Sequence, residues 1–308
     1  MKNKVSVVVV TRNRERDLEH CLGSLACQLE TLDELVVIDN NSSDGTAQIV
    51  KNFSKNVLFK VKYIKHGKIG YPHVYNRGLI EAKGNWVAFI DDDCVADPSW
   101  YKNIKLMTGR FPKLSVILGK SSEYYQKNVM ALTKSYIDEV GKIGAIKNRL
   151  ILDYEILDSK NIVYNKNFLN KNKILFDTNL LKYANGASED CDLGMQIYSA
   201  GGVAIFNEKI NVVHKDPTAI KTYYKKAFFS LENHLVYEKK WERVRLNINT
   251  KRSVIDKIRL FIKFKQTYCL NNLQTLAVIC NVVVTFFYIK IMRKVLKSKI
   301  LRMQIKQK

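Results

Sequence analysis

Short apolar segments alternate with amphipathic helical patterns over the first hundred residues, and this alternation constrains the fold most. Val5 to Val10 is an almost unbroken β-branched run, and Leu35 to Ile38, Val61 to Ile64 and Trp86 to Ile90 are similar apolar segments. Between them, apolar residues recur at spacings of three and four, as on one face of a helix. Such strands are typical of a parallel sheet covered on both faces. We therefore predict an α/β fold with a doubly wound, mostly parallel sheet and flanking helices.

Polar residues follow three of these predicted strands directly. Thr11 to Arg14 follow the first strand, Asp39 to Thr46 follow the second, and Asp91 to Asp93 follow the fourth. Ligands of doubly wound sheets bind beyond the carboxyl ends of the strands. The three polar segments therefore mark the expected functional site.

The three consecutive aspartates are the first candidates for metal binding. In an extended backbone, the side chains of Asp91 and Asp93 point to the same side and could share one divalent cation. Such an ion commonly positions the diphosphate of a nucleotide. The alternative is a solvated acidic turn or a helix N-cap.

Two further segments could contact a nucleotide. Asp39 could accept a hydrogen bond from a pyrimidine ring or a ribose hydroxyl, while Ser43 or Asp44 would cap a helix over residues 47–53. Arg77, on the predicted helix before the acidic strand, could approach a phosphate or ribose, and an ordinary surface arginine is the alternative.

The later part of the chain offers a candidate base. Asp190 opens a helix predicted to end at Ser199, before strands over residues 203–206 and 210–213. A carboxylate is favoured at a helix N-terminus whatever its function, but Asp190 could also take a proton from an attacking hydroxyl. His214 follows the last strand and could be a third metal ligand or a surface histidine. Between them, residues 124–183 have weak periodicity, and we expect short helices and loops there.

Four segments together resemble the family 2 glycosyltransferases of the GT-A fold. These segments are VSVVVVTRNR, LVVIDNNSSDGT, YNRGLIEAKGNWVAFIDDDCVADPSW and SEDCDLGMQIYSAGG, and the match runs over about residues 4–214 in the same order. The His66 to Tyr71 segment departs from the usual pattern of the family, in which a Gly-rich stretch leads into the following helix.

The resemblance implies specific roles for the candidate residues. Asp39 would contact the base, and Asp91 and Asp93 would form the D-x-D pair for ribose and Mg²⁺ or Mn²⁺. Asp190 would be the base of an inverting displacement. By the same resemblance, Thr11 and Asn13 would line the nucleotide pocket, His214 would bind the metal and Asn161 would lie on the acceptor side. Apart from the resemblance, we assign Arg77 and Asp92 to the nucleotide and Glu189 to the acceptor side.

The C-terminal third is strongly basic. Residues 215–308 contain 22 Lys or Arg and 5 Asp or Glu, so they hold most of the formal charge of +22. We predict a domain boundary there, with a glycosyltransferase domain over 1–214 and a basic helical region over 215–308. Basic clusters beside an apolar helix favour attachment to anionic lipid. A single membrane span around residues 270–291 is the alternative, diluted by several Asn and Gln residues.

The cysteines and the N-terminus bear on location. The six cysteines have no metal-finger or disulfide-framework spacing, and the apolar run at the N-terminus is too short for a signal peptide. We expect a cytoplasmic protein, peripheral on the inner face of the cell membrane.

We therefore predict a metal-dependent inverting glycosyltransferase. Its donor would be a nucleotide-diphosphate sugar, with UDP favoured, and its acceptor a glycan or lipid-linked glycan. One alternative is a sugar-phosphate nucleotidyltransferase, although the segment after the first strand lacks the expected Gly-rich loop. The other is a non-catalytic basic protein that binds membranes or nucleic acid, but no nucleic-acid motif is present and we expect no nucleic-acid partner.

Overall fold

The computed structural model describes residues 4–31, 33–182, 188–245 and 253–305. The chain divides into two compact units. Unit 1 comprises residues 1–122, 145–178 and 189–214, and unit 2 comprises residues 123–144, 179–188 and 215–308. The division after His214 falls where the sequence becomes basic, but a helical segment from the middle of the chain also belongs to unit 2.

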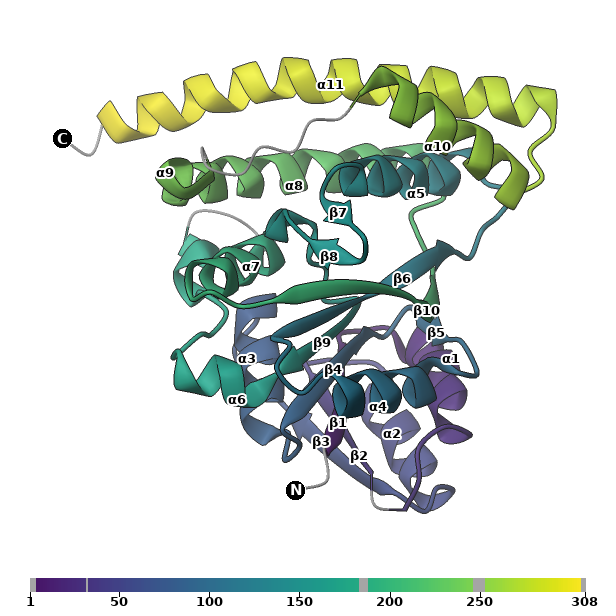
Figure 1. Ribbon diagram of the computed structural model, residues 1–308, viewed down its shortest axis with the longest axis vertical. Coiled ribbons are helices and arrows are strands. Elements are labelled where there is room, and N and C mark those ends of the chain that lie inside the picture. The colour runs from purple at the N-terminus through teal and green to yellow at the C-terminus, as the bar shows by residue number, and fades with distance from the viewer. Residues whose placement is uncertain (1–3, 32, 183–187, 246–252, 306–308) are drawn as a thin grey trace. The chain divides into compact units, whose positions relative to one another are not determined.

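Unit 1 is built on a mixed sheet (Figure 1). Within the described residues, ten strands form this sheet in the order β3-β2-β1-β4-β9-β6-β10-β8-β7, and β5 pairs with β10. The strands are β1 (Val5–Thr11), β2 (Glu34–Asp39), β3 (Lys60–Lys65), β4 (Trp86–Asp91), β5 (Cys94–Ala96), β6 (Val116–Glu123), β7 (Ile146–Lys147), β8 (Leu150–Ile151), β9 (Asn161–Asn165) and β10 (Ala204–His214).

The first four sheet positions are parallel, as the sequence predicts. Strand β1 pairs in parallel with β2 on one side and β4 on the other, and Val10 lies opposite both Ile38 and Asp91. Strand β9 pairs antiparallel with β4 and β6. The parallel register brings the carboxyl ends of β1, β2 and β4 to one edge of the sheet.

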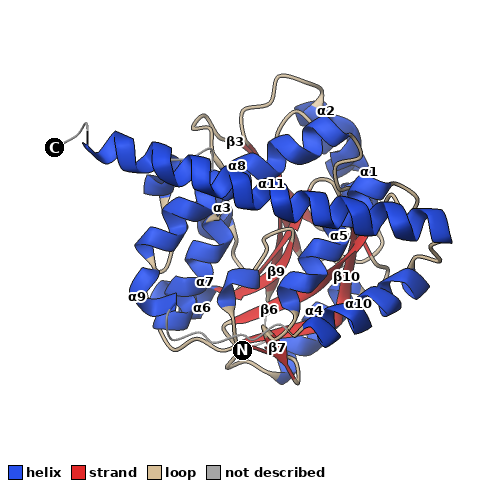
Figure 2. Ribbon diagram, turned by 90° about the horizontal axis from the view of Figure 1, so that it is seen from above, coloured by secondary structure: helices blue, strands red, loops and turns tan. Residues whose placement is uncertain are grey.

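Helices cover both faces of this sheet (Figure 2). One buried cluster joins inward residues of β1 and β2 to α1, α2 and α4. A second cluster joins the other face to α3, α6 and α7. The helices of unit 1 are α1 (Glu15–Ala26), α2 (Thr46–Lys55), α3 (Tyr71–Glu81), α4 (Trp100–Arg110), α6 (Lys166–Lys171) and α7 (Glu189–Ser199), and a 3-10 helix, η1, covers Tyr154–Ile156.

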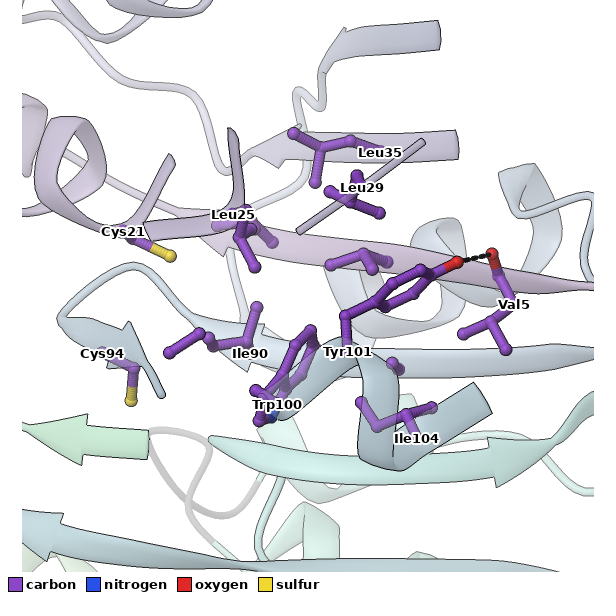
Figure 3. Packing of buried hydrophobic residues seen from close by; sticks show 14 of the residues in the cluster. Val5, Cys21, Leu25, Leu29, Leu35, Ile90, Cys94, Trp100, Tyr101 and Ile104 are labelled. Atoms are coloured by element: carbon purple, nitrogen blue, oxygen red, sulfur yellow. Dashed lines mark hydrogen bonds between the residues drawn. The ribbon is translucent and has the colours of Figure 1, made fainter. Parts of the chain in front are cut away.

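The first cluster contains large side chains that fix the helices to the sheet (Figure 3). Trp100 and Tyr101 are fully buried, and the Tyr101 hydroxyl donates a hydrogen bond of 3.3 Å to the Val5 carbonyl. Successive β1 residues alternate between the two clusters because strand side chains alternate between faces. This explains why the β1 run is apolar on both sides.

Three details differ from the predictions. Residues 203–206 and 210–213 do not form two strands, because the backbone continues through them as the single strand β10. The middle region contains a 14-residue helix, α5, and the central strand β9. Helix α2 has no side-chain cap at its N-cap position, Gly45, although Asp44 accepts a hydrogen bond of 3.2 Å from the Thr46 amide.

Unit 2 is helical in its described residues, apart from the end of β6. It contains α5 (Val129–Lys142), α8 (Ile220–Lys240), α9 (Glu242–Arg245), α10 (Val254–Thr267) and α11 (Asn272–Ile305). Apolar residues of α5, α10 and α11 form one cluster, and residues of α8 and α11 form another. Among the described residues, α11 alone is long and apolar enough to cross a membrane, judged by length and composition, over Asn272–Ser298.

Candidate active site

Six carboxylates gather beside the carboxyl end of β4. Asp91 ends the strand, Asp92 and Asp93 follow it, and two other segments supply the remaining three, Asp158, Glu189 and Asp190. Burial and the charges of Asp93, Asp158 and Asp92 raise the pKa of Asp91 to about 8. Such crowding of negative charge is favourable for a bound cation.

The backbone around the three aspartates differs from the sequence prediction. Strand β4 ends at Asp91, and Asp92 and Asp93 lie in a turn. The side-chain alternation of an extended strand therefore does not apply to Asp91 and Asp93. The Tyr75 hydroxyl donates a hydrogen bond of 3.3 Å to Asp91 Oδ1.

Asp92 and Asp93 are held by an arginine from the loop after β1. Arg14 Nη1 lies 2.9 Å from Asp92 Oδ1 and 2.5 Å from Asp93 Oδ2. Burial raises the pKa of Asp92 to about 6, although the positive charge of Arg14 opposes this shift. Arg14 thus joins the end of β1 to the acidic turn, a role that the sequence alone did not assign.

A possible metal ligand set lies at this turn. Asp93, Cys94 and His214 place one potential ligand atom each within 4.8 Å of one another. His214 lies opposite Cys94 in the β10–β5 pairing, and its Nε2 is 3.3 Å from Asp93 Oδ1. Carboxylate oxygen together with imidazole nitrogen fits Mn²⁺, whereas Mg²⁺ prefers oxygen ligands and would be held mainly by the neighbouring carboxylates. The residues present are therefore suitable for either predicted ion.

The candidate base lies at the N-terminus of α7. The Ser159 hydroxyl donates a hydrogen bond to Asp190 Oδ1. Burial and the nearby charge of Asp158 raise the pKa of Asp190 to about 7. A carboxylate with this pKa can accept a proton near neutral pH.

Tyr75 is close enough to both Asp190, the candidate base, and Asp91, at the end of β4, for their charges to change its pKa. Burial and the charges of Asp91, Asp190 and Glu189 raise the pKa of the Tyr75 phenol well above its ordinary value. Glu189 is buried, and its Oε2 has no hydrogen-bond partner within the described residues. Burial and the charge of Asp190 raise the pKa of Glu189 as well. Asp91, Glu189 and Asp190 therefore belong to one site.

The predicted base-binding residues line the loops after β1 and β2. The side chain of Asn13 accepts a hydrogen bond of 2.8 Å from the Ser43 amide, and the Asn40 amide bonds the Thr11 carbonyl at 2.8 Å. Asp39 is buried and accepts hydrogen bonds from the Ser42 amide at 2.8 Å and the Tyr63 hydroxyl at 2.5 Å. The two loops thus form one connected wall at the edge of the sheet.

Two predicted residues have other partners. Asn161 is 1% exposed, its Nδ2 donates to the Lys120 and Ile210 carbonyls, and its Oδ1 accepts from the Trp100 indole at 2.8 Å. These contacts tie β9 to β6, β10 and helix α4, so the Asn161 side chain supports the packing of the sheet against α4. Arg77 Nη2 pairs with Glu81 at 2.5 Å on the same helix.

This fold, with an acidic strand end and a buried carboxylate at a neighbouring helix N-terminus, is that of a nucleotide-sugar glycosyltransferase. The sequence model described as glycosyl transferase family 2 matches residues 6–170, more than half of the chain. The chain belongs to glycosyl transferase family 2. This membership sets aside the nucleotidyltransferase and non-catalytic alternatives.

Characterised relatives share part of the sequence. The chain is 35% identical over 124 residues to the GalNAc(5)-diNAcBac-PP-undecaprenol beta-1,3-glucosyltransferase of Campylobacter jejuni, which is 40% of this chain and 36% of that protein. It is 37% identical over 92 residues to the poly(ribitol-phosphate) beta-N-acetylglucosaminyltransferase TarS of Staphylococcus aureus, 29% of this chain and 16% of that protein. The chain thus matches about a third or less of the length of these relatives.

Solved structures show the same fold. The S. aureus TarS 1-349 complex with UDP-GlcNAc has a TM-score of 0.57 at 17% identity, covering 97% of this chain and 92% of that one. The mannosyltransferase PcManGT of Pyrobaculum calidifontis, in complex with GDP-Man and Mn²⁺, has a TM-score of 0.58 at 16% identity, covering 92% and 76%. The predicted GT-A type fold is confirmed.

Proposed function

We propose that the protein is a metal-dependent inverting glycosyltransferase that moves a sugar from a UDP-sugar to a hydroxyl of a glycan or lipid-linked glycan. The observation that carries this proposal is the environment of Asp190. Asp190 is a half-buried carboxylate with a pKa of about 7, and it accepts a hydrogen bond from Ser159. Its charge and that of Asp91 both raise the pKa of Tyr75.

In the proposed reaction, Asp190 takes the proton of the acceptor hydroxyl. The acceptor oxygen forms a bond to the anomeric carbon from the face opposite the diphosphate, and the bond between that carbon and the diphosphate oxygen breaks. The proton ends on Asp190, and the electron pair leaves with the nucleoside diphosphate. One displacement of this kind inverts the anomeric configuration. Ser159 would hold the carboxylate in position during the transfer.

A divalent ion would be held by Asp91, Asp93 and His214. When bound, it would stabilise the negative charge on the departing diphosphate. Arg14 already neutralises part of the charge on Asp92 and Asp93. The Mn²⁺ in the PcManGT complex supports the choice of Mg²⁺ or Mn²⁺ here.

The nucleotide would lie along the loops after β1 and β2. Thr11, Asn13 and Asp39 would contact the base and ribose, with Asp92 and Arg77 assigned to the nucleotide on the sequence pattern. UDP is favoured because TarS, which shares the fold over nearly the whole chain, has been solved with UDP-GlcNAc. Glu189, whose Oε2 is buried, would face the acceptor together with the Asn161 region.

The names of two relatives support the proposed acceptor class, and the basic C-terminal region supports the proposed location. One relative is named for an undecaprenol-linked glycan and another for a poly(ribitol-phosphate) polymer. Similar acceptors, together with the basic C-terminal region, support a cytoplasmic enzyme that is peripheral on the inner face of the membrane.

The test is sugar transfer by Asp190→Asn with donor binding measured separately. We expect transfer to fall by about a thousand-fold or more while the affinity for the UDP-sugar stays within a few-fold, because general-base catalysis contributes about this much. Asp192→Asn is the matched control on the same helix, because the Asp192 carboxylate accepts a hydrogen bond of 2.8 Å from the Gln196 side chain and has no proposed role in the reaction. Unchanged transfer in Asp190→Asn would remove Asp190 from this role.

A further inference from the structure

Helix α11 has two different faces along its described side chains. Val278, Val282, Thr285 and Leu296 are buried and recur at helical spacing. Apolar residues on the opposite face are exposed by 42–62%: Leu276, Ile279, Val283, Phe286, Phe287 and Ile291. The inner face therefore packs within unit 2, and the outer face leaves a long apolar stripe uncovered in this unit.

The outer face becomes cationic toward the C-terminal end. Lys290, Lys294 and Lys297 are exposed. At 100° per residue, they fall in line with Ile279 and Val283 on the same side of the helix. One continuous surface thus carries an apolar part followed by a row of ammonium groups.

Helix α11 runs along α8 in unit 2 (Figure 1), and polar contacts on its inner face hold it against α5 and α8. Asn281 Nδ2 donates a hydrogen bond of 2.9 Å to Thr133 Oγ1 of α5. The hydroxyls of Thr285 and Tyr223 of α8 are 3.2 Å apart, and Arg293 pairs with Glu238 of α8 at 2.5 Å. These contacts extend over the middle of the apolar stretch.

This packing is incompatible with a helix that crosses a bilayer. A spanning α11 would either lose these partners or draw α5 and α8 into the hydrocarbon. Helix α8 carries exposed Lys221, Lys225 and Lys226 beside the apolar stretch. Burying such charges at the bilayer centre is strongly unfavourable. The apolar residues of α11 are therefore better covered on the outer face alone than by a bilayer that surrounds the helix.

We propose that the outer face of α11 docks in the plane of an anionic lipid bilayer, with its apolar residues among the acyl chains and Lys290, Lys294 and Lys297 at the phosphate headgroups. This deepens the proposed location of the enzyme and does not depend on its chemistry. An interfacial helix of this kind gains both from apolar burial and from attraction to anionic lipid.

Charge and shape favour lipid over a second copy of the chain. Residues 215–308 contain 22 basic and 5 acidic residues, so two such regions repel each other while anionic headgroups attract them. An apolar groove of about 550 Å³ between α5, α8 and α11 adjoins the stripe, lined in part by Met130, Ile220, Ala277 and Val284. The groove extends the apolar surface that acyl chains would cover.

Flotation of the full chain with vesicles tests the proposal. We expect binding to vesicles of mixed phosphatidylcholine and phosphatidylglycerol and little binding to phosphatidylcholine alone. The double variant Ile279→Glu/Phe287→Glu should have an affinity for these vesicles that is lower by about ten-fold or more. Lys290→Gln/Lys294→Gln/Lys297→Gln should lose the preference for anionic lipid. Leu106→Glu, at a residue of α4 that is 59% exposed, is the matched control and should bind like the parent.

Labelling separates in-plane docking from a span. Leu273→Cys and Lys297→Cys are each placed in a chain whose exposed cysteines, Cys27, Cys269 and Cys280, are replaced by serine. Each protein would be treated with an impermeant maleimide after it is added outside sealed vesicles. Both positions should react to the same extent. Protection of only one of the two cysteines from the maleimide would overturn the proposal, and so would equal binding to neutral and anionic vesicles. Self-association that Phe287→Glu abolishes, with no binding to vesicles, would overturn it as well. Hydrolysis of a soluble donor, measured in parallel, distinguishes failed docking from failed catalysis or folding.

Discussion

The Ser159 hydroxyl donates a hydrogen bond to Oδ1 of Asp190 at the N-terminus of α7, and Ser159 adjoins β9, a strand that the sequence pattern does not reveal. Ser159 precedes β9, which runs antiparallel to β4, and the Asp91 amide bonds the Lys160 carbonyl at 3.3 Å. The segment 158–160 therefore lies beside the end of β4. This position explains why Ser159 and Asp158, both distant in sequence from Asp190, act on the candidate base: Ser159 donates a hydrogen bond to it, and Asp158 raises its pKa.

Removing the Ser159 hydroxyl should slow transfer. A hydrogen bond to a charged group is worth about 1.5–3 kcal/mol, so we expect kcat of Ser159→Ala to fall by about ten-fold to a hundred-fold. Ser159→Thr, which keeps a hydroxyl, is the matched variant and should retain most of the activity. Equal loss in both variants would mean that the site tolerates no change of shape and that the hydrogen bond is not responsible.

The pH dependence of transfer should follow Asp190. A base with a pKa of about 7 is active when it is ionised, so kcat/KM should rise as pH increases through about 7. The charge of Asp158 raises this pKa, and Asp158→Asn should therefore move the rise to lower pH. Glu208→Gln, at an exposed residue, should leave the profile in place. A rise that moves to higher pH in Asp158→Asn would contradict the assignment.

Arg14 should stabilise the metal-free protein. Asp92 and Asp93 are almost fully buried beside it, whereas the Arg14 side chain is 36% exposed, which weakens the pair. We expect Arg14→Gln to lower the free energy of unfolding by about 1–2 kcal/mol, and saturating MnCl₂ to recover part of the loss. Thermal unfolding with and without MnCl₂ measures both effects. A variant as stable as the parent, or one that gains nothing from the ion, would argue against a shared acidic site.

Substitution of Asn161 distinguishes a structural role of its side chain from contact with the acceptor substrate. Asn161→Ala removes two hydrogen bonds to neighbouring strands and one to Trp100 of α4, and we expect a loss of about 3 kcal/mol or more in the free energy of unfolding. Trp100→His retains a ring nitrogen near Asn161 Oδ1, and it separates the loss of indole packing from that of the amide network. Gly119 packs against the Asn161 amide, and a Cβ there would lie 2.3 Å from Nδ2. A raised acceptor KM at full stability would instead support the acceptor-side role implied by the family resemblance.

The sequence predicts the parallel half of the fold well. The runs at Val7 and Val36 are apolar on both faces because helices cover the sheet on both sides, and that pattern is local. The polar strand ends also mark the site, since Asp39 and Asp91 end adjacent strands of one parallel set. These features follow from periodicity and from the connection rule for parallel strands.

The remaining features depend on long-range pairing. Strand β9 has a short apolar core flanked by asparagines and lies in a region of weak periodicity, so nothing local indicates that it pairs with β4. The link from Arg14 to Asp92 and Asp93 and the Ser159–Asp190 bond join segments far apart in sequence. The inner face of α11 is similar, because its apolar composition does not reveal that Asn281 and Thr285 bond neighbouring helices.

Nucleotide release from a panel of UDP-, dTDP- and GDP-sugars with Mn²⁺ or Mg²⁺ tests the roles of the acidic turn and of Asp190 most directly, because slow hydrolysis reveals the donor without the acceptor. We predict metal-dependent release from a UDP-sugar that is lost in both Asp93→Ala and Asp190→Asn. Release that needs no metal, or that persists in both variants, would contradict the assignment of the acidic turn and of Asp190 to the reaction.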